Sequence, residues 1–197
     1  LIRPIVEYDE SDSASLDKVF ELLTLTEYSP EHAINMLIPP AWENDKHLDE
    51  DVRAFFEYKS LLMKPWDGPA AIVFTDGVKV GAHLDRNGLR PSRYIITKDD
   101  IIILGSEVGM VDIPFEDIKE SQRLSPGDTI CIDTHNKSLK TTEEILKTLS
   151  QEKPYKRWIE ENLIRLESTI KEKSLEDEHI DKDTLTRLQA FFGYTTE

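Results

Sequence analysis

The 197-residue sequence is poor in cysteine and has no long apolar run. Its single cysteine, Cys131, excludes a disulfide within the chain and any metal or iron–sulfur site built from several thiolates. No apolar segment approaches the roughly 18 residues that predict a membrane-spanning helix. The first residues lack the basic start and the apolar stretch of a signal peptide. Low cysteine usage is typical of a reducing compartment, and we expect no membrane partner.

Several short signals for chemistry are also missing. There is no G-x-G-x-x-G and no phosphate loop. The formal net charge is −15, so nucleic-acid backbone would be repelled, and we expect no such partner. The histidines show no helical pair at the spacing of metal ligands, and they predict no zinc or iron site: His32, His47, His83, His135 and His179.

The apolar pattern predicts helices, then a sheet, then helices again. A first helix is expected from a cap at Ser13 or Ser15 to about Leu23, and two more follow at 29–37 and 49–63. Alternating apolar runs and turn signals, among them Asp76-Gly77, then predict an antiparallel sheet of about five strands. The expected strands are 70–74, 78–82, 94–97, 101–104 and 129–133. The fold class is therefore α+β.

The last part of the chain has a different composition. From residue 141 onward it is rich in Lys and Glu with a helical spacing of Leu and Ile. Residues 167–183 are expected to form an exposed linker or helix surface. The apolar end, 185–194, predicts docking on something outside this chain. We expect a domain over 1–140 and a helical, charged extension over 141–197 that leads to the next domain.

Three segments carry more polar chemistry than their turns require. Ser11-Asp12-Ser13 precedes a helix, so it is either an N-terminal cap or a carboxylate that binds a ligand ammonium. Leu84-Asp85-Arg86-Asn87-Gly88-Leu89-Arg90-Pro91 needs Asn, Gly and Pro for a turn, but not its charges. Gly105-Ser106-Glu107-Val108-Gly109 follows a hairpin. Asp85, Arg86, Arg90 and Glu107 are predicted to form one ion-paired loop network. Cys131, between two isoleucines of a strand, is expected to be a buried, inert thiol.

These segments occur together in one family. Asp85 to Pro91 followed by Ser106-Glu107 resembles the loops of N-terminal-nucleophile, class-II glutamine amidotransferases. Pro39-Pro40-Ala41-Trp42 and Pro65-Trp66-Asp67-Gly68-Pro69-Ala70 narrow the resemblance to the glutamate synthase large-subunit family. So do Arg53-Ala54-Phe55-Phe56, Pro126-Gly127 and Pro154-Tyr155-Lys156-Arg157-Trp158. The chain is similar to the C-terminal half of that family's amidotransferase domain.

The resemblance implies a fold and a chemistry. The fold would be part of a four-layer αββα sandwich. An N-terminal Cys would attack the glutamine amide with its own amine as base, and an Asn-Gly pair would form the oxyanion hole. Asp12 is the only residue here that matches a glutamine-binding position, that of the α-ammonium ligand. The nucleophile, the substrate Arg and the Asn-Gly pair lie upstream of Leu1 in the family, so no catalytic residue is expected in this chain.

The resemblance also implies the setting of the parent protein. Ammonia would pass to an FMN-containing barrel, where 2-oxoglutarate becomes glutamate. Electrons would arrive through an iron–sulfur cluster (3Fe-4S), with FAD and NADPH on a small subunit, or ferredoxin, as partner. No cofactor is expected in this chain. The expected location is the cytoplasm, or the plastid of a photosynthetic eukaryote.

Two alternatives remain open on the sequence. The chain starts with Leu rather than Met, which favours a trimmed or excerpted piece of a longer protein. A stand-alone, non-catalytic module that binds or regulates a synthase would also lack the nucleophile. The third reading is the same domain in another synthetase, such as asparagine synthetase or amidophosphoribosyltransferase.

Overall fold

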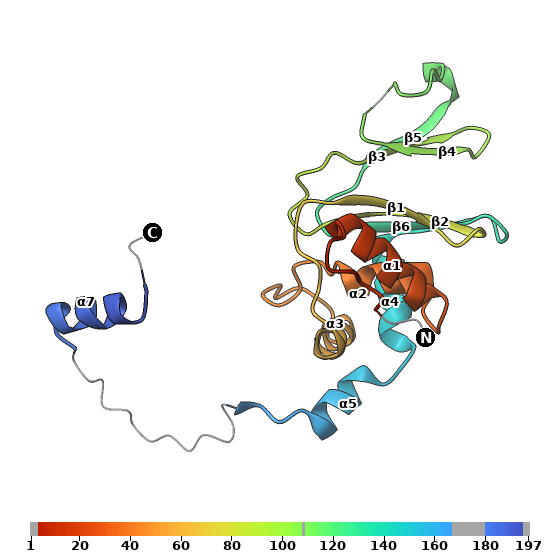
Figure 1. Ribbon diagram of the computed structural model, residues 1–197. Coiled ribbons are helices and arrows are strands. Elements are labelled where there is room, and N and C mark those ends of the chain that lie inside the picture. Colours follow the sequence, from red (N-terminus) through yellow and green to blue (C-terminus); the bar gives the residue numbers. More distant parts are fainter. Residues whose placement is uncertain (1–3, 108, 167–179, 195–197) are drawn as a thin grey trace. The chain divides into compact units, whose positions relative to one another are not determined.

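The structure is a computed structural model that describes residues 4–107, 109–166 and 180–194. The chain forms two compact units, Leu1–Glu161 and Asn162–Glu197, whose elements are labelled in Figure 1. Within the described ranges, no helix is long and apolar enough to cross a membrane.

The three helices predicted at the start of the chain are confirmed. They are α1 (Asp12–Thr24), α2 (Pro30–Leu37) and α3 (Glu50–Leu62). The predicted cap of α1 was wrong. Ser11 is the N-cap, because its backbone is extended (φ −69°, ψ 152°) and its side chain accepts a hydrogen bond from the Ala14 N–H. Asp12 and Ser13 therefore lie in the first turn of the helix.

The strands form two antiparallel sheets, where the sequence predicted one. The first has the order β1-β2-β6-β7, with β1 (Ala71–Thr75), β2 (Lys79–Leu84), β6 (Thr129–Asp133) and β7 (Ser138–Lys140). The second has the order β4-β3-β5, with β3 (Arg93–Thr97), β4 (Ile102–Gly105) and β5 (Ile118–Arg123). β5 follows a 3₁₀ turn, Phe115–Asp117. The sequence missed β5 and β7 because β5 is mostly polar and exposed and β7 has only 3 residues.

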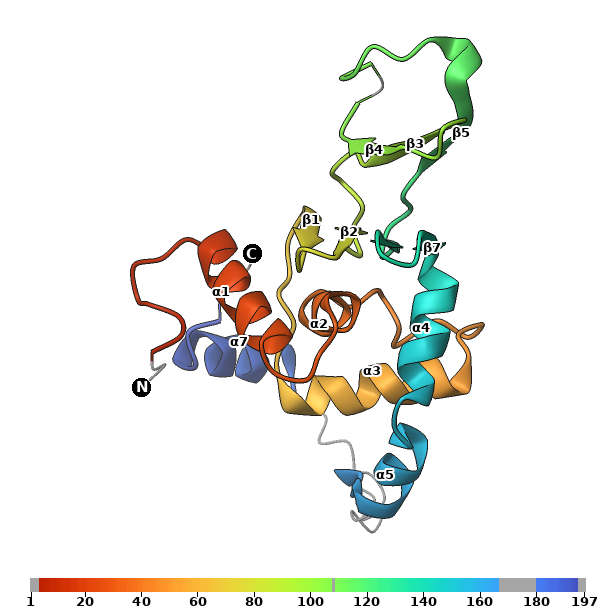
Figure 2. The same ribbon diagram turned by 90° about the vertical axis from the view of Figure 1, so that its right-hand side faces the viewer.

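Each face of the first sheet carries a core. Its outer face packs on the helices, where Ile34, Leu37 and Phe74 are buried against the apolar side of α1. Its inner face meets the second sheet through Leu84, Tyr94 and other buried residues: Ala82, Ile96, Leu124 and Ile130. Figures 1 and 2 show this order of helices, first sheet and second sheet. The mixed helices and antiparallel sheets confirm the α+β class.

The first unit ends later than the boundary predicted after residue 140. Helix α4 (Thr142–Gln151) begins with a capping box of Thr141 and Glu144 and packs against α3. Helix α5 (Tyr155–Asn162) places the Tyr155 ring 5.5 Å from the Phe55 ring. Both helices thus share the core of the first unit, and the division between units falls after Glu161.

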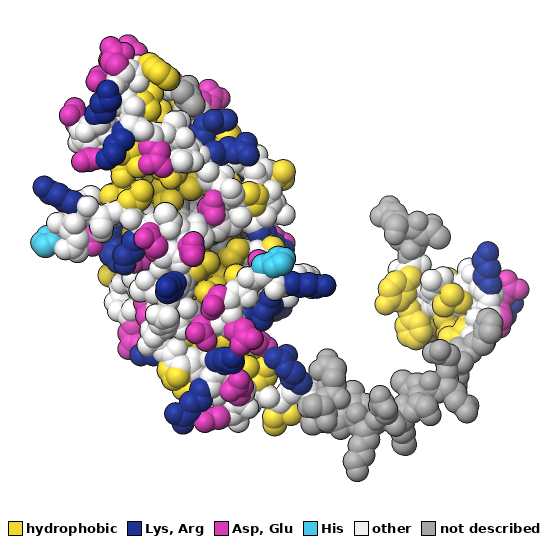
Figure 3. Space-filling model, turned by 180° about the vertical axis from the view of Figure 1, so that it is seen from behind, with side chains coloured by type: hydrophobic (Ala, Val, Ile, Leu, Met, Phe, Trp, Pro, Cys, Tyr) yellow, Lys and Arg dark blue, Asp and Glu magenta, His cyan; other side chains and the backbone are white. Residues whose placement is uncertain are grey.

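The second unit contains α7 (Lys182–Phe191), capped by Asp181. Its apolar side chains are exposed, with Phe191 at 82% and Phe192 at 68%. Figure 3 shows hydrophobic atoms on the surface of this unit, and acidic and basic side chains mixed over one face of the first. Of the linker predicted over 167–183, residues 167–179 lie outside the described ranges.

Candidate functional site

Asp12 is exposed at the first turn of α1. The turn is closed by Ser11, whose Oγ accepts from the Ala14 N–H at 3.3 Å and lies 3.2 Å from the Ser13 Oγ. The cap is thus made by Ser11, and among the described residues no hydrogen bond or ion pair engages the Asp12 carboxylate. A carboxylate in the first helical turn is favoured by the helix dipole. The backbone of Asp12 is therefore fixed by the helix, while its carboxylate oxygens stay available to a ligand.

The segment before Asp12 is tied to the body of α1. Lys18 forms an ion pair with Glu10, and its Nζ lies 3.7 Å from Glu7 Oε1. The hydrogen bond between the two side chains lowers the pKa of Glu10 and raises that of Lys18. This pairing folds the approach to α1 back onto the helix.

A groove of about 640 Å³ runs between α1 and β1. On the helix side it is lined by Ser13, Leu16 and Phe20, and on the other side by the whole of β1. Strand β1 is an edge of its sheet. The groove therefore starts one residue from Asp12 and follows an open sheet edge.

The backbone of β1 shows which groups face that edge. The Asp85 N–H donates to the Ala70 carbonyl at 3.0 Å, and hydrogen-bonded pairs alternate along an antiparallel ladder. Ile72 and Phe74 therefore bond to β2. Ala71, Val73 and Thr75 direct their N–H and C=O groups to the open edge, and the Val73 side chain is 63% exposed. An unpaired edge of this kind is a template for another strand.

Asp85, the first residue of the predicted loop network, is buried at 1% exposure. Its carboxylate accepts from the Asn87 N–H at 2.8 Å, from Asn87 Nδ2 at 2.9 Å and from the Ala70 N–H at 3.2 Å. Burial by itself would raise the pKa of Asp85, but these hydrogen bonds outweigh it and lower the pKa. Asp85 thus holds its own loop in shape.

The other members of the predicted network are not brought together. Arg86 Nη2 pairs with Asp67 Oδ2 at 2.7 Å. Glu107 lines a small cavity beside Arg93 on the second sheet. Among the described residues, no hydrogen bond or ion pair joins Arg90 or Glu107 to Asp85 or Arg86. The sequence pattern predicted that these charges lie in neighbouring loops, but it did not indicate that Asp67 is the partner of Arg86.

Cys131 is buried, as predicted. Burial, reinforced by the nearby Glu31 carboxylate, raises the pKa of its thiol to about 12. The thiolate is the nucleophilic form of cysteine, so this environment opposes reactivity.

A buried polar network beneath the first sheet was missed from the sequence. Thr129 Oγ1 lies 2.8 Å from His83 Nδ1 and accepts from Asn35 Nδ2 at 3.2 Å. A hydroxyl beside an imidazole has the geometry of a nucleophile and its base. Thr129 and His83 are 0% and 1% exposed, however, so no substrate reaches them. The network joins α2 to β2 and β6, which are far apart in the sequence. No local sequence pattern therefore predicts it.

Lys59 is a second feature without a sequence signal. It is 5% exposed, and its ammonium lies over the rings of Tyr28 at 4.6 Å and Tyr155 at 5.3 Å. Burial lowers the pKa of Lys59 to about 8. Nearby, His32 Nδ1 is 3.0 Å from Glu152 Oε2, and burial lowers the pKa of His32 to about 3. The two rings thus hold a buried ammonium between the segment before α2, helix α3 and helix α5.

Comparison with known proteins identifies the family of this chain. Residues 1–158 match the model of the class-II glutamine amidotransferases. The chain is 45% identical over 196 residues to the glutamate synthase [NADPH] large chain of Bacillus subtilis, covering all of this chain and 13% of that protein. It is 45% identical over 199 residues to ferredoxin-dependent glutamate synthase 2 of Synechocystis, again with 100% and 13% covered. For glutamate synthase [NADH] of Schizosaccharomyces pombe the identity is 37% over 205 residues, with 100% and 10% covered. The chain belongs to the class-II glutamine amidotransferases.

Proposed function

We propose that this class-II amidotransferase chain is the C-terminal half of the glutaminase domain of a glutamate synthase large subunit. The parent protein would hydrolyse glutamine and use the ammonia to convert 2-oxoglutarate to glutamate. The chain spans about an eighth of the relatives' length, 13% for two of them, so the remaining domains would be the partners of this one.

The exposed carboxylate of Asp12 carries the proposal. It stands in the first turn of α1 without a partner among the described residues, beside a groove with an open strand edge. A glutamine α-ammonium needs such a fixed anion, and a charge-assisted hydrogen bond to it is strong. Asp12 would therefore bind the α-ammonium of glutamine.

Residues outside this chain would complete the site. The only thiol is Cys131, which is buried with a raised pKa, so the nucleophile must come from elsewhere in the parent polypeptide. The open edge at Ala71, Val73 and Thr75 is where a further strand of the domain would pair. By itself the chain would then be inactive toward glutamine.

The cofactors implied for the parent do not fit residues of this chain. An iron–sulfur cluster is held by several cysteine thiolates, and the sequence has only Cys131, in the middle of a strand. FMN, the cluster and the electron donor would belong to other domains or to a partner. The residues of this chain would bind and orient glutamine only.

Substitution of Asp12 in the parent enzyme tests the proposal. Asp12→Ala should lower kcat/KM for glutamine through a loss of about 2–5 kcal/mol of binding, as for other truncated charge pairs. The rate with free ammonia should not change, because ammonia bypasses this site. Asp9→Ala is the matched control, since Asp9 is also exposed and lies three residues earlier. An unchanged kcat/KM for glutamine in Asp12→Ala would contradict the role of Asp12.

A second measurement tests the proposed division of the site. The chain alone should release no ammonia from glutamine. Co-expression with the remaining part of the parent's glutaminase domain should restore release. Glutamine hydrolysis by the isolated, purified chain would overturn the proposal.

A further inference from the structure

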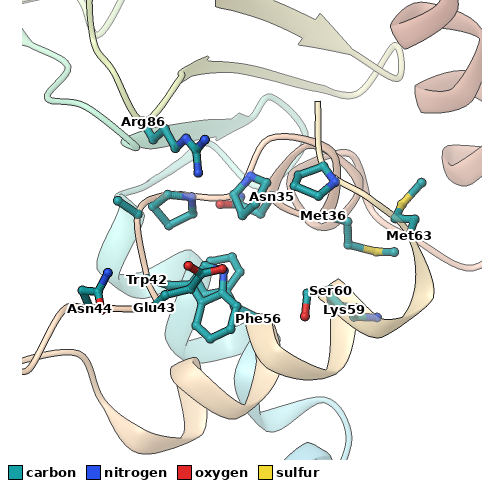
Figure 4. Close-up of a pocket in the computed structure, with 14 residues that line it drawn as sticks. Asn35, Met36, Trp42, Glu43, Asn44, Phe56, Lys59, Ser60, Met63 and Arg86 are labelled. Carbon is teal, nitrogen blue, oxygen red and sulfur yellow. The ribbon is translucent and has the colours of Figure 1, made fainter. Parts of the chain in front are cut away.

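Parts of the segments that narrowed the resemblance, which glutamine chemistry does not use, line one cavity. Residues 39–44, Met63, Pro65 and Arg86 line it, together with residues of α2 and α3. The cavity measures about 230 Å³, and we call it the Trp42 cleft. Figure 4 shows Arg86 reaching in from one side and Trp42 with Glu43 on the other.

The wall that carries Trp42 is held rigidly. Arg53 Nη1 donates to the carbonyls of Trp42 at 3.1 Å and Glu43 at 3.0 Å, and Nη2 donates to that of Asp45. The Trp42 ring stacks on the Phe56 ring, with an interplanar angle of 17°. One guanidinium thus fixes the whole loop, and the indole has little freedom to close the cleft.

The opposite wall is fixed as well. The Gly127 N–H donates to the carbonyls of Leu84 at 3.0 Å and Asp85 at 3.1 Å. Gly127 has φ +81°, and a Cβ there would lie 2.7 Å from Pro40 Cβ, so only glycine allows this close packing. The loop that carries Arg86 and the proline wall are therefore locked together. The cleft is preformed, which lowers the entropic cost of binding a ligand.

The chemistry of the cleft joins two opposite charges to an apolar floor. The Arg86 guanidinium can donate five hydrogen bonds, and its pair with Asp67 joins one nitrogen, Nη2, to a carboxylate oxygen. The Glu43 carboxylate stands on the facing wall. Between them lie apolar side chains: Met36, Phe56, Met63 and Pro65. An anion beside Arg86, a cation beside Glu43 and an apolar group on the floor would satisfy all three surfaces.

Size and charge narrow the ligand class. The volume of about 230 Å³ lies below the roughly 300–1,000 Å³ of pockets for drug-sized molecules, so a nucleotide would not fit. Glu43 would repel the second carboxylate of a dicarboxylate, because Arg86 is already paired with Asp67. The other cation of the lining, Lys59, directs its ammonium to the rings of Tyr28 and Tyr155. A small zwitterion remains.

We propose that the Trp42 cleft binds a free α-amino acid with an apolar side chain. Its carboxylate pairs with Arg86, its ammonium with Glu43, and its side chain lies on the indole of Trp42 and the two methionines. This site is separate from the glutamine site at Asp12, because the cleft and the groove beside Asp12 share no lining residue.

Titration of this chain with L-methionine and L-phenylalanine tests the site. The indole N–H resonance of Trp42, identified with Trp42→Phe, should shift saturably in NMR spectra. Arg86→Gln and Glu43→Gln should each weaken binding about tenfold or more, because each removes a charge-assisted hydrogen bond. Arg90→Gln should bind as the unmodified chain does, since Arg90 is an exposed arginine of the same loop that does not line the cleft.

Blocked ligands keep the test valid if a variant fails to fold. N-acetyl-L-methionine and L-methionine methyl ester, each lacking one charge, should bind about tenfold more weakly or worse. No saturable shift up to about 20 mM, where a millimolar Kd would saturate, would overturn the proposal, as would equal binding of the blocked ligands. Asp12→Ala should leave methionine binding unchanged, so this result is independent of the glutamine site.

Discussion

Two aspartates, Asp12 in the first turn of α1 and Asp85 at the end of β2, belong to polar segments singled out from the sequence, and the structure gives them opposite environments. Asp85 is 1% exposed and accepts three hydrogen bonds from its own loop and the neighbouring strand. Asp12 is exposed, and its helix is capped by Ser11 instead. A carboxylate whose oxygens accept hydrogen bonds from the chain itself stabilises the fold. A carboxylate whose oxygens accept none, on a backbone fixed by a helix, is suited to binding a ligand.

The same contrast holds between two regions on the helix-covered face of the first sheet. Beneath β2 and β6, the buried polar groups Asn35, His83 and Thr129 bond to one another. Beside β1, the backbone of Val73 and the carboxylate of Asp12 face outward. The first region is predicted to control stability and the second to control function.

Replacement of Asp85 should have the largest effect on stability. Asp85→Ala leaves buried N–H donors without an acceptor, and we expect a loss of about 3 kcal/mol or more in the free energy of unfolding. Urea denaturation of Asp85→Ala and of Asp12→Ala measures both losses. Asp12→Ala should cost less than about 1 kcal/mol, because an exposed first-turn carboxylate contributes only through the helix dipole. Equal losses in the two variants would erase the comparison.

The histidine in the closed region should make stability depend on pH. Burial lowers the pKa of His83 from 6.5 to about 4, so the folded state favours the neutral ring. Its contribution is complete above pH 6.5 and is lost as the pH falls toward 4, at about 1.4 kcal/mol per pH unit. Unfolding free energies measured between these limits should fall less steeply in His83→Gln. An unchanged slope would show that His83 is not held neutral.

Removal of the Thr129 hydroxyl, which His83 and Asn35 both contact, should have a smaller effect on stability. Thr129→Val keeps the shape but deprives His83 and Asn35 of a partner, and we expect a loss of about 1–2 kcal/mol. The exposed Thr148→Val is the control and should change stability by less than about 0.5 kcal/mol, because its hydroxyl only donates back to the Glu144 carbonyl of its own helix. Thermal and urea unfolding distinguish the two.

Cys131 should have no effect on activity. Cys131→Ser in the parent enzyme should leave glutaminase activity intact, because the thiol is buried and its pKa is raised to about 12. Loss of glutamine hydrolysis, with folding and the ammonia-dependent rate preserved, would show that Cys131 takes part in the reaction.

Much of the fold could be predicted from the sequence. Ser29-Pro30 at the start of α2, the Asp76-Gly77 turn and the apolar runs of β1 and β3 are local signals, and each element lies within a few residues of its prediction. The mostly polar strand β5 was missed, and the strands were assigned to one sheet instead of two. Sheet membership depends on pairing between distant segments, which no local pattern contains.

The sequence by itself determined the element types, the charge and the resemblance of its loops to one family, because these follow from residue order over short distances. Only the tertiary structure decided that the Asp85 carboxylate accepts hydrogen bonds from the chain while that of Asp12 accepts none among the described residues. It also decided that Arg86 pairs with Asp67 and that separate segments of the chain enclose the Trp42 cleft. The physical reason is that hydrogen-bond satisfaction and burial are properties of neighbours in space. The chain brings those neighbours together only when its two sheets and their covering helices have packed.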